Sequence, residues 1–158
     1  MIRPVLTFPH PALKRPCEPA DANTALSVAE DLVDTMRAHP GCVGLAAPQI
    51  GILVRVAVID VRGHRLTTAS SGLVALFNPV VVVTAGQRVG REGCLSLPNV
   101  TADVDRAERL LLTPRPDGEP LWSEGFEARA IQHEIDHLDG ILILDRVTSA
   151  HALHPRKT

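Results

Sequence analysis

Apolar residues recur with the spacing of an α-helix in two stretches of the chain. The first helix is expected from about Thr24 to His39, where the apolar positions lie three or four residues apart: Leu26, Ala29, Leu32, Val33 and Met36. Asn23 or Thr24 can cap its start. The second is expected from about Ser123 to Leu138 and ends at Asp139-Gly140, because glycine readily adopts the positive φ that follows many helices.

Between these stretches the pattern is typical of β-strands. Apolar and β-branched runs, separated by turn-forming residues, predict strands at residues 54–60, 73–77, 80–84 and 109–113, and a further short strand at 141–147. Residues 62–72 are polar and predict a surface loop. The order of elements predicts an α+β fold in one domain of residues 1–158, with mostly antiparallel strands packed around a central helix and an additional N-terminal helix.

The two ends of the chain have little regular patterning. The first 20 residues contain five prolines, which favour extended chain and turns wrapped over the domain, although a flexible tail is the alternative. Residues 151–158 have too little apolar content to predict an ordered element.

Composition narrows the class of protein. The chain has 158 residues, a net charge of −2 and only 3% aromatic residues, which argues against a nucleic-acid-binding surface. No apolar run is long enough for a membrane span, and the first residues lack a signal-peptide core, so we expect a cytoplasmic protein without membrane contact. Three cysteines argue against a disulfide framework and leave room for a functional thiol.

The sequence His133-Glu134-Ile135-Asp136-His137 within the second helix carries the strongest chemical signal. Two histidines four residues apart lie on one helical face and can bind one metal ion, while Glu134 can move a proton to or from water at that ion. A chance pair of surface histidines is the alternative. Phe126 and Ala130 share the stripe with both histidines and favour a buried position, where unpaired imidazoles would be costly.

A catalytic metal site usually needs a third protein ligand. Asp139 lies on the wrong face of the helix, whereas Cys94, which follows a glycine and precedes leucine, can approach a metal in a dry pocket. Cys42 and Cys17 compete with it, but each is more readily explained as a small buried hydrophobe.

Three segments together resemble the peptide deformylase family. They are Val43-Gly44-Leu45-Ala46-Ala47-Pro48-Gln49-Ile50-Gly51, then Glu92-Gly93-Cys94-Leu95-Ser96, then Gln132-His133-Glu134-Ile135-Asp136-His137-Leu138-Asp139-Gly140. They occur in the order and at the separations usual for the family, and the similarity runs from the N-terminal prolines to about Val147.

The resemblance implies a role for each of these positions. Cys94, His133 and His137 would bind one divalent ion, typically Fe²⁺, which Zn²⁺, Ni²⁺ or Co²⁺ can replace. Glu134 would be the general acid and base. Gln49 and the backbone N–H of Leu95 would donate hydrogen bonds to the formyl oxygen as it gains negative charge.

The substrate implied is a nascent peptide that begins with formyl-methionine. Substrate contacts would come from Val43 and Gly44 in an extended groove, from Glu92, and from Phe126, Arg129 and Ala130 around the first side chain. Glu92 can alternatively form an ion pair with Arg106, which would contribute little if it were exposed.

The chain departs from the family pattern at the outer groove. Cys42 stands where the family commonly has glycine, and the region of Thr101 lacks the arginine that many members carry after the second segment. The C-terminal residues are too few and too polar for a ribosome-docking helix, so at most transient ribosome contact is expected.

Two other functions remain compatible with the residues. One is a small zinc peptidase that cuts internal bonds, although such enzymes usually take a third histidine or a carboxylate rather than Cys94 as ligand. The other is a protein that binds formyl-peptides or metal without turnover.

Overall fold

The computed structural model describes residues 1–156 and confirms the α+β fold. The α-helices are α1 (Ala22–Arg37), α2 (Gly125–Leu138) and α3 (Ile143–Arg146), and the 3-10 helices are η1 (Pro11–Lys14), η2 (Ala47–Ile50) and η3 (Ala150–Ala152). The strands are β1 (Gly44–Ala46), β2 (Val56–Ile59), β3 (Val74–Phe77), β4 (Val80–Ala85), β5 (Arg88–Cys94), β6 (Leu97–Arg106), β7 (Arg109–Thr113), β8 (Leu121–Glu124) and β9 (Leu153–Pro155).

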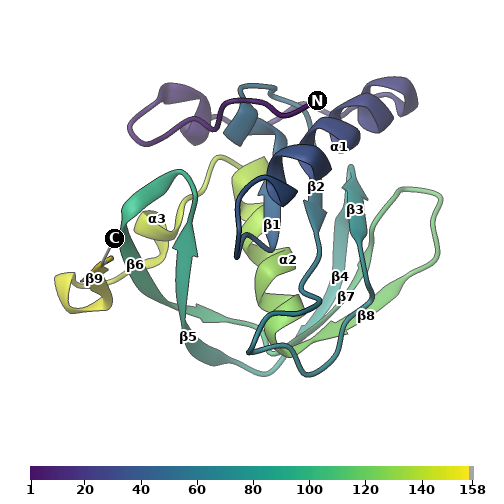
Figure 1. Ribbon diagram of the computed structural model, residues 1–158. Coiled ribbons are helices and arrows are strands. Elements are labelled where there is room, and N and C mark those ends of the chain that lie inside the picture. Colours follow the sequence, from purple (N-terminus) through teal and green to yellow (C-terminus); the bar gives the residue numbers. More distant parts are fainter. Residues whose placement is uncertain (157–158) are drawn as a thin grey trace.

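These strands form three antiparallel sheets around one helix. The sheets have the strand orders β1-β2-β3, β4-β7-β8 and β5-β6-β9. Figure 1 shows α2 at the centre, with β5 and β6 on one side and β2 and β3 on the other. The predicted central helix is therefore confirmed. The sheet that contains Gly44–Ala46 and the sheet that contains Cys94 both lie beside it.

Helix α1 begins two residues earlier than expected. Its N-cap is Asp21, whose carboxylate accepts a hydrogen bond from the Thr24 backbone N–H at 2.8 Å. Its buried face includes Ala25, Val28 and Leu32, whereas Leu26 is 55% exposed. The helical spacing placed the apolar stripe correctly except at Leu26, which lies at its solvent edge.

Helix α2 begins later than expected because the residues before it form a strand. Residues 121–124 pair with β7 as β8, and Gly125 with φ +63° turns the chain into the helix. The helix ends at Leu138, and Gly140 adopts φ +74° as expected. A Cβ atom at Gly140 would lie 2.8 Å from the backbone of Lys14, so this glycine also admits the N-terminal segment.

The prediction of a strand at residues 141–147 is wrong, because Ile143–Arg146 forms the short helix α3. The Asp145 carboxylate accepts a hydrogen bond from the Leu142 backbone N–H at 2.8 Å and so stabilises the first turn. Apolar residues cannot distinguish a short strand from a short buried helix by spacing alone.

The ends of the chain are more ordered than their composition suggested. Leu6 donates a backbone hydrogen bond to Gln49, and Leu13 is fully buried, which confirms that the proline-rich segment wraps over the domain. Residues 153–155 pair with β6 as β9, so the expectation of no ordered element after residue 150 is wrong up to Arg156, and Lys157 and Thr158 lie outside the described residues. No helix within residues 1–156 combines the length and apolar character that a bilayer crossing requires.

Candidate metal centre and peptide groove

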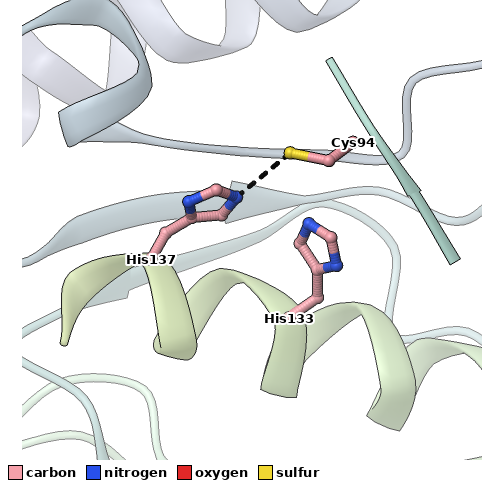
Figure 2. Close-up of side chains that lie close together, drawn as sticks. All are labelled: Cys94, His133 and His137. Atoms are coloured by element: carbon pink, nitrogen blue, oxygen red, sulfur yellow. Dashed lines mark hydrogen bonds between the residues drawn. The ribbon is translucent and has the colours of Figure 1, made fainter. Parts of the chain in front are cut away.

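Strand β5 and helix α2 bring together three residues with metal-ligating atoms. Cys94, His133 and His137 each offer one such atom, and these atoms all lie within 4.8 Å of one another. Both imidazoles project from the same face of α2 toward Cys94, as Figure 2 shows. The Sγ atom of Cys94 lies 3.4 Å from Nε2 of His137.

The donor set fits a divalent transition metal. One sulfur and two imidazole nitrogens are ligands that Fe²⁺, Zn²⁺, Ni²⁺ and Co²⁺ accept, and three protein ligands leave a position open for water or substrate. Among the described residues, Oε2 of Glu134 and Nδ1 of His137 are buried without a hydrogen-bond partner. An unsatisfied carboxylate oxygen beside the cluster is suited to a water or substrate amide at that open position.

The electrostatics of the cluster favour an ionised sulfur. Burial disfavours the Cys94 thiolate, but the neighbouring His137 and His133 outweigh burial and hold the pKa of Cys94 well below that of a free thiol. A thiolate is the form of cysteine that binds metal. Cys42 behaves differently, because burial raises its pKa to about 12 and its thiol donates a hydrogen bond to the Gly44 carbonyl.

Glu92 fixes the orientation of His133. Its Oε1 lies 2.8 Å from Nδ1 of His133, so Nε2 of the same ring is directed at the cluster. The same carboxylate accepts two hydrogen bonds from Arg106, at 2.9 and 3.0 Å, and one from Arg129 at 2.7 Å. Burial opposes ionisation of Glu92, but His133 and Arg106 outweigh it and hold its pKa well below the ordinary value.

The ion pair of Glu92 with Arg106 is buried rather than exposed. The two side chains are only 5% and 4% accessible, so its contribution is not reduced by solvent screening. Arg106 also bonds to Asp136 at 2.5 Å, and Asp136 pairs with Arg146 at 2.6 Å. Asp136 therefore connects α2 to β6 and α3, and the alternative of a solvent-facing residue does not hold.

Glu134 is buried beside the cluster. Its Oε1 lies 3.9 Å from Nε2 of His133, and burial raises its pKa although both histidines oppose the shift. Gly44 of β1 passes very close: a Cβ atom there would lie 3.1 Å from Cγ and Oε1 of Glu134. The absence of a side chain at position 44 thus makes room for the carboxylate.

Gln49 and Leu95 also lie beside Cys94. The Gln49 carbonyl oxygen accepts a hydrogen bond from the Ala46 backbone N–H at 3.0 Å, which turns its Nε2 toward Cys94 at 3.5 Å and Ser96 at 3.1 Å. Leu95 follows β5 directly and lines the same cavity. Ser96, which the sequence analysis gave no role, is fully buried and holds the Gln49 amide in place.

The cluster opens into a cavity of about 410 Å³. Every residue expected to contact substrate lies on its wall: Val43, Gly44, Gln49, Glu92, Leu95, Phe126, Arg129 and Ala130. Both oxygens of Glu92 are engaged by protein groups, however, and the Arg129 guanidinium bonds to Glu92 and to the backbone oxygens of Val104 and Arg88. These contacts indicate that the Glu92 carboxylate and the Arg129 guanidinium position other protein groups rather than bind substrate. The aliphatic part of the Arg129 side chain is then the part that faces the cavity.

The sequence analysis did not predict several residues that lie on the cavity wall. His64 stacks on Phe126 with ring centroids 4.3 Å apart, and Arg65 and Leu66 of the same loop also face the cavity. Arg156 reaches it from the C-terminal segment. His64 and Arg156 lie far from the recognised motifs along the chain, so no local pattern indicates their position.

Fold and site define a small metal-dependent hydrolase with a Cys-His-His centre. A family model described as "Polypeptide deformylase" matches residues 2–152. The chain is 40% identical to Peptide deformylase 1 of Bacillus subtilis (strain 168) over 152 residues, which cover 93% of this chain and 91% of the relative. The chain therefore belongs to the peptide deformylase family, metal-dependent enzymes that remove the N-formyl group from nascent peptides.

Solved structures agree with this assignment. A peptide deformylase from Legionella pneumophila superposes with a TM-score of 0.81 at 34% identity, covering 94% of this chain and 87% of that one. A class I type b peptide deformylase from Acinetobacter baumannii, solved with Met-Ala-Ser bound, gives a TM-score of 0.81 at 33% identity and covers 92% of this chain and 99% of that one.

Proposed function

We propose that this chain, as a single catalytic domain of residues 1–158, hydrolyses the formyl group from formyl-methionyl peptides and releases formate. The observation that carries the proposal is the position of Glu134 beside Cys94, His133 and His137 at the inner end of the cavity. The Acinetobacter relative binds Met-Ala-Ser, the product that such a reaction would leave, and this supports a peptide of the same kind for this chain.

Cys94, His133 and His137 would hold one divalent ion, for which we propose Fe²⁺, with Zn²⁺, Ni²⁺ or Co²⁺ able to replace it. When bound, the ion supplies Lewis-acid chemistry: it polarises the formyl carbonyl and lowers the pKa of water. Glu92 keeps His133 oriented for this task through its 2.8 Å contact with Nδ1. Ferrous iron beside a thiolate is sensitive to O₂, because oxidation of either removes the site.

Glu134 acts as the proton carrier. It takes a proton from the water that attacks the formyl carbon and passes it to the amide nitrogen, so that the C–N bond breaks to give formate and a free amine. Its raised pKa suits a group that must hold the proton between these two steps. Gln49 Nε2 and the Leu95 N–H donate to the formyl oxygen as negative charge develops there.

The peptide lies along the cavity in extended form. Val43 and Gly44 offer backbone groups to it, and the first side chain points to Phe126, Ala130 and the Arg129 stem. An unbranched apolar side chain such as methionine fits an apolar pocket of this kind. We place the enzyme in the cytoplasm, where it meets nascent chains through transient rather than stable contact with the ribosome.

The direct test is formate release from formyl-Met-Ala-Ser by protein purified under anaerobic conditions with its metal content measured. Formate should appear with one equivalent per peptide, should cease on metal chelation and should return when Fe²⁺ is added. A fully metal-loaded protein that releases no formate, yet binds a hydroxamate tightly, would show a binding protein instead of an enzyme.

Cys94 separates the deformylase from a zinc peptidase. Cys94→Ala should abolish stoichiometric metal binding and formate release, because it removes one of three ligands. Cys17→Ala is the matched control: Cys17 is also buried but lies outside the cluster, so metal content should not change. Unchanged metal binding in Cys94→Ala would favour the peptidase, which cuts internal bonds in unformylated peptides.

A further inference from the structure

The C-terminal segment returns to the groove and is held there by several contacts. Strand β9 pairs with β6, with Thr101 opposite His154 and Ala102 opposite Leu153. The Arg156 backbone N–H donates to the Asn99 carbonyl at 2.9 Å, and His154 Nε2 lies 2.9 Å from the Asp103 carboxylate. The backbone that carries Arg156 is therefore fixed in register with β6.

The Arg156 side chain crosses β5 beside the metal ligand Cys94. A Cβ atom at Gly93 would lie 2.7 Å from Nη2 and 3.1 Å from Cζ of Arg156. The guanidinium thus occupies the space above Gly93 that any other residue would fill. Arg156, Thr101, Cys94 and Glu134 all line the same cavity.

Arg156 differs from the neighbouring arginines in its electrostatic environment. Arg91 pairs with Asp103 at 2.9 Å, and Arg129 pairs with Glu92 at 2.7 Å. Within residues 1–156, no carboxylate lies within ion-pair distance of Arg156, and its side chain is exposed. Its donors are available to an oxygen that enters the groove.

We propose that Arg156 is a substrate-binding residue that donates hydrogen bonds to oxygens of the peptide beyond the formyl-methionine. This inference depends on the proposed function. With the formyl group beside Cys94 and the first side chain at Phe126, the rest of an extended peptide must leave the cavity along its wall. A guanidinium there matches a peptide carbonyl or a carboxylate, since its planar donors can bind either in bidentate fashion.

The same arrangement accounts for a departure noted in the sequence. The region of Thr101 lacks an arginine, but β9 places His154 opposite Thr101 and so delivers Arg156 to this part of the groove. The cation comes from Arg156, which directly follows β9, rather than from β6 itself.

Steady-state kinetics of Arg156→Ala on three substrates test the proposal. For formyl-Met-Ala-Ser, KM should rise about fivefold while kcat stays within about twofold, as expected for a charge-assisted hydrogen bond at an exposed site. Formyl-methioninamide has no residue beyond methionine and should show no change. The third substrate, formyl-Met-Ala-Ser with a C-terminal amide, distinguishes the two possible acceptors. If Arg156→Ala raises KM equally for the acid and the amide, the acceptor is a backbone carbonyl; if KM for the amide does not rise, the acceptor is the terminal carboxylate.

Three variants act as controls. Arg156→Lys should recover part of the loss, since it keeps the charge but not the planar donors. Arg115→Ala removes an exposed arginine that packs on the Phe77 ring outside the cavity and should not change KM. His154→Ala should raise KM by a smaller factor by loosening β9, and should add nothing when combined with Arg156→Ala.

The proposal is overturned if Arg156→Ala leaves KM unchanged on both tripeptides, or if it impairs formyl-methioninamide equally. Calorimetric binding of Met-Ala-Ser gives a readout independent of turnover, and Arg156→Ala should weaken it about fivefold. Absence of formate from the wild-type protein would instead overturn the proposed function, so the two failures are distinct.

Discussion

The inner end and the outer rim of the cavity are built by different means. At the inner end, Cys94, His137 and Glu134 are buried, and Glu92 connects His133 to two arginines through a closed set of hydrogen bonds. At the rim, the Arg65 and Arg156 side chains are exposed; Arg65 lies in a loop, and Arg156 directly follows the terminal strand β9.

This difference indicates that the inner end of the cavity determines reactivity and that the rim determines which substrate binds. A buried ion-pair network tolerates little change, because removal of one partner leaves another charge buried without compensation. Exposed side chains on loops can be exchanged at small cost. We therefore expect substitutions to lose effect steadily from Glu134 outward to His64.

The largest effect is expected for Glu134→Gln. The amide has nearly the same shape but cannot take up a proton, so kcat should fall by about 10³-fold or more while metal content is retained. Formate release and metal analysis on the same preparation check this. If kcat fell by less than about tenfold, another group would carry the proton. Substitutions at the inner end would then have no larger effect on catalysis than substitutions at the rim.

A smaller effect on catalysis, with a loss of stability, is expected for Glu92→Gln. His133 loses its charged partner and Arg106 is left buried beside a neutral amide, which should weaken metal affinity by about 10- to 100-fold and lower the free energy of unfolding by about 3 kcal/mol. Metal titration and urea unfolding measure the two. Glu119→Gln, an exposed carboxylate, is the control and should change neither.

The same network predicts how stability depends on pH. Because the pKa of Glu92 is lowered in the folded protein, its stabilising contribution is fully present above the unfolded-state pKa of 4.5 and is lost progressively as pH falls below it. Urea unfolding of the metal-free protein between pH 6 and pH 3 should show a decline in the wild type that is shallower in Glu92→Gln. Parallel curves would mean that Glu92 does not contribute through its charge.

The smallest effect is expected for His64→Ala at the rim. Loss of the stacking contact with Phe126 should lower kcat/KM for formyl-Met-Ala-Ser about two- to threefold, with kcat and metal content unchanged. His151→Ala, which changes an exposed histidine outside the cavity, should have no effect. A loss in kcat as large as that of Glu92→Gln would show that the rim takes part in the chemistry.

The sequence predicted best what depends on local spacing. The helical positions of His133 and His137, the end of α2 at Gly140 and the stripe of α1 all follow from residues a few positions apart. Strands β5 and β6 were missed because Arg88–Cys94 carries two glycines and three charged residues, and only pairing with β6 reveals it as a strand. The buried state of the Glu92–Arg106 pair depends on the same pairing.

The remaining parts of the site come from contacts across long separations. Arg156 reaches Gly93 only because β9 joins β6, and His64 meets Phe126 only because the loop of residues 62–72 packs on α2. Neither contact has a periodic signature in sequence. Metal ligands were easier to identify than rim residues, since their residue types are chemically restricted and rim residues are not.

The close approach of Gly44 to Glu134 restricts how this enzyme can evolve under selection by an inhibitor that fills the groove. Any side chain at position 44 would displace the carboxylate by a few tenths of an ångström, so a change that excluded the inhibitor there would also disturb the group proposed to carry the proton. The rim side chains of His64 and Arg156 lie against Phe126 and Gly93 instead. Resistant lineages should therefore accumulate substitutions at the rim and retain glycine at 44.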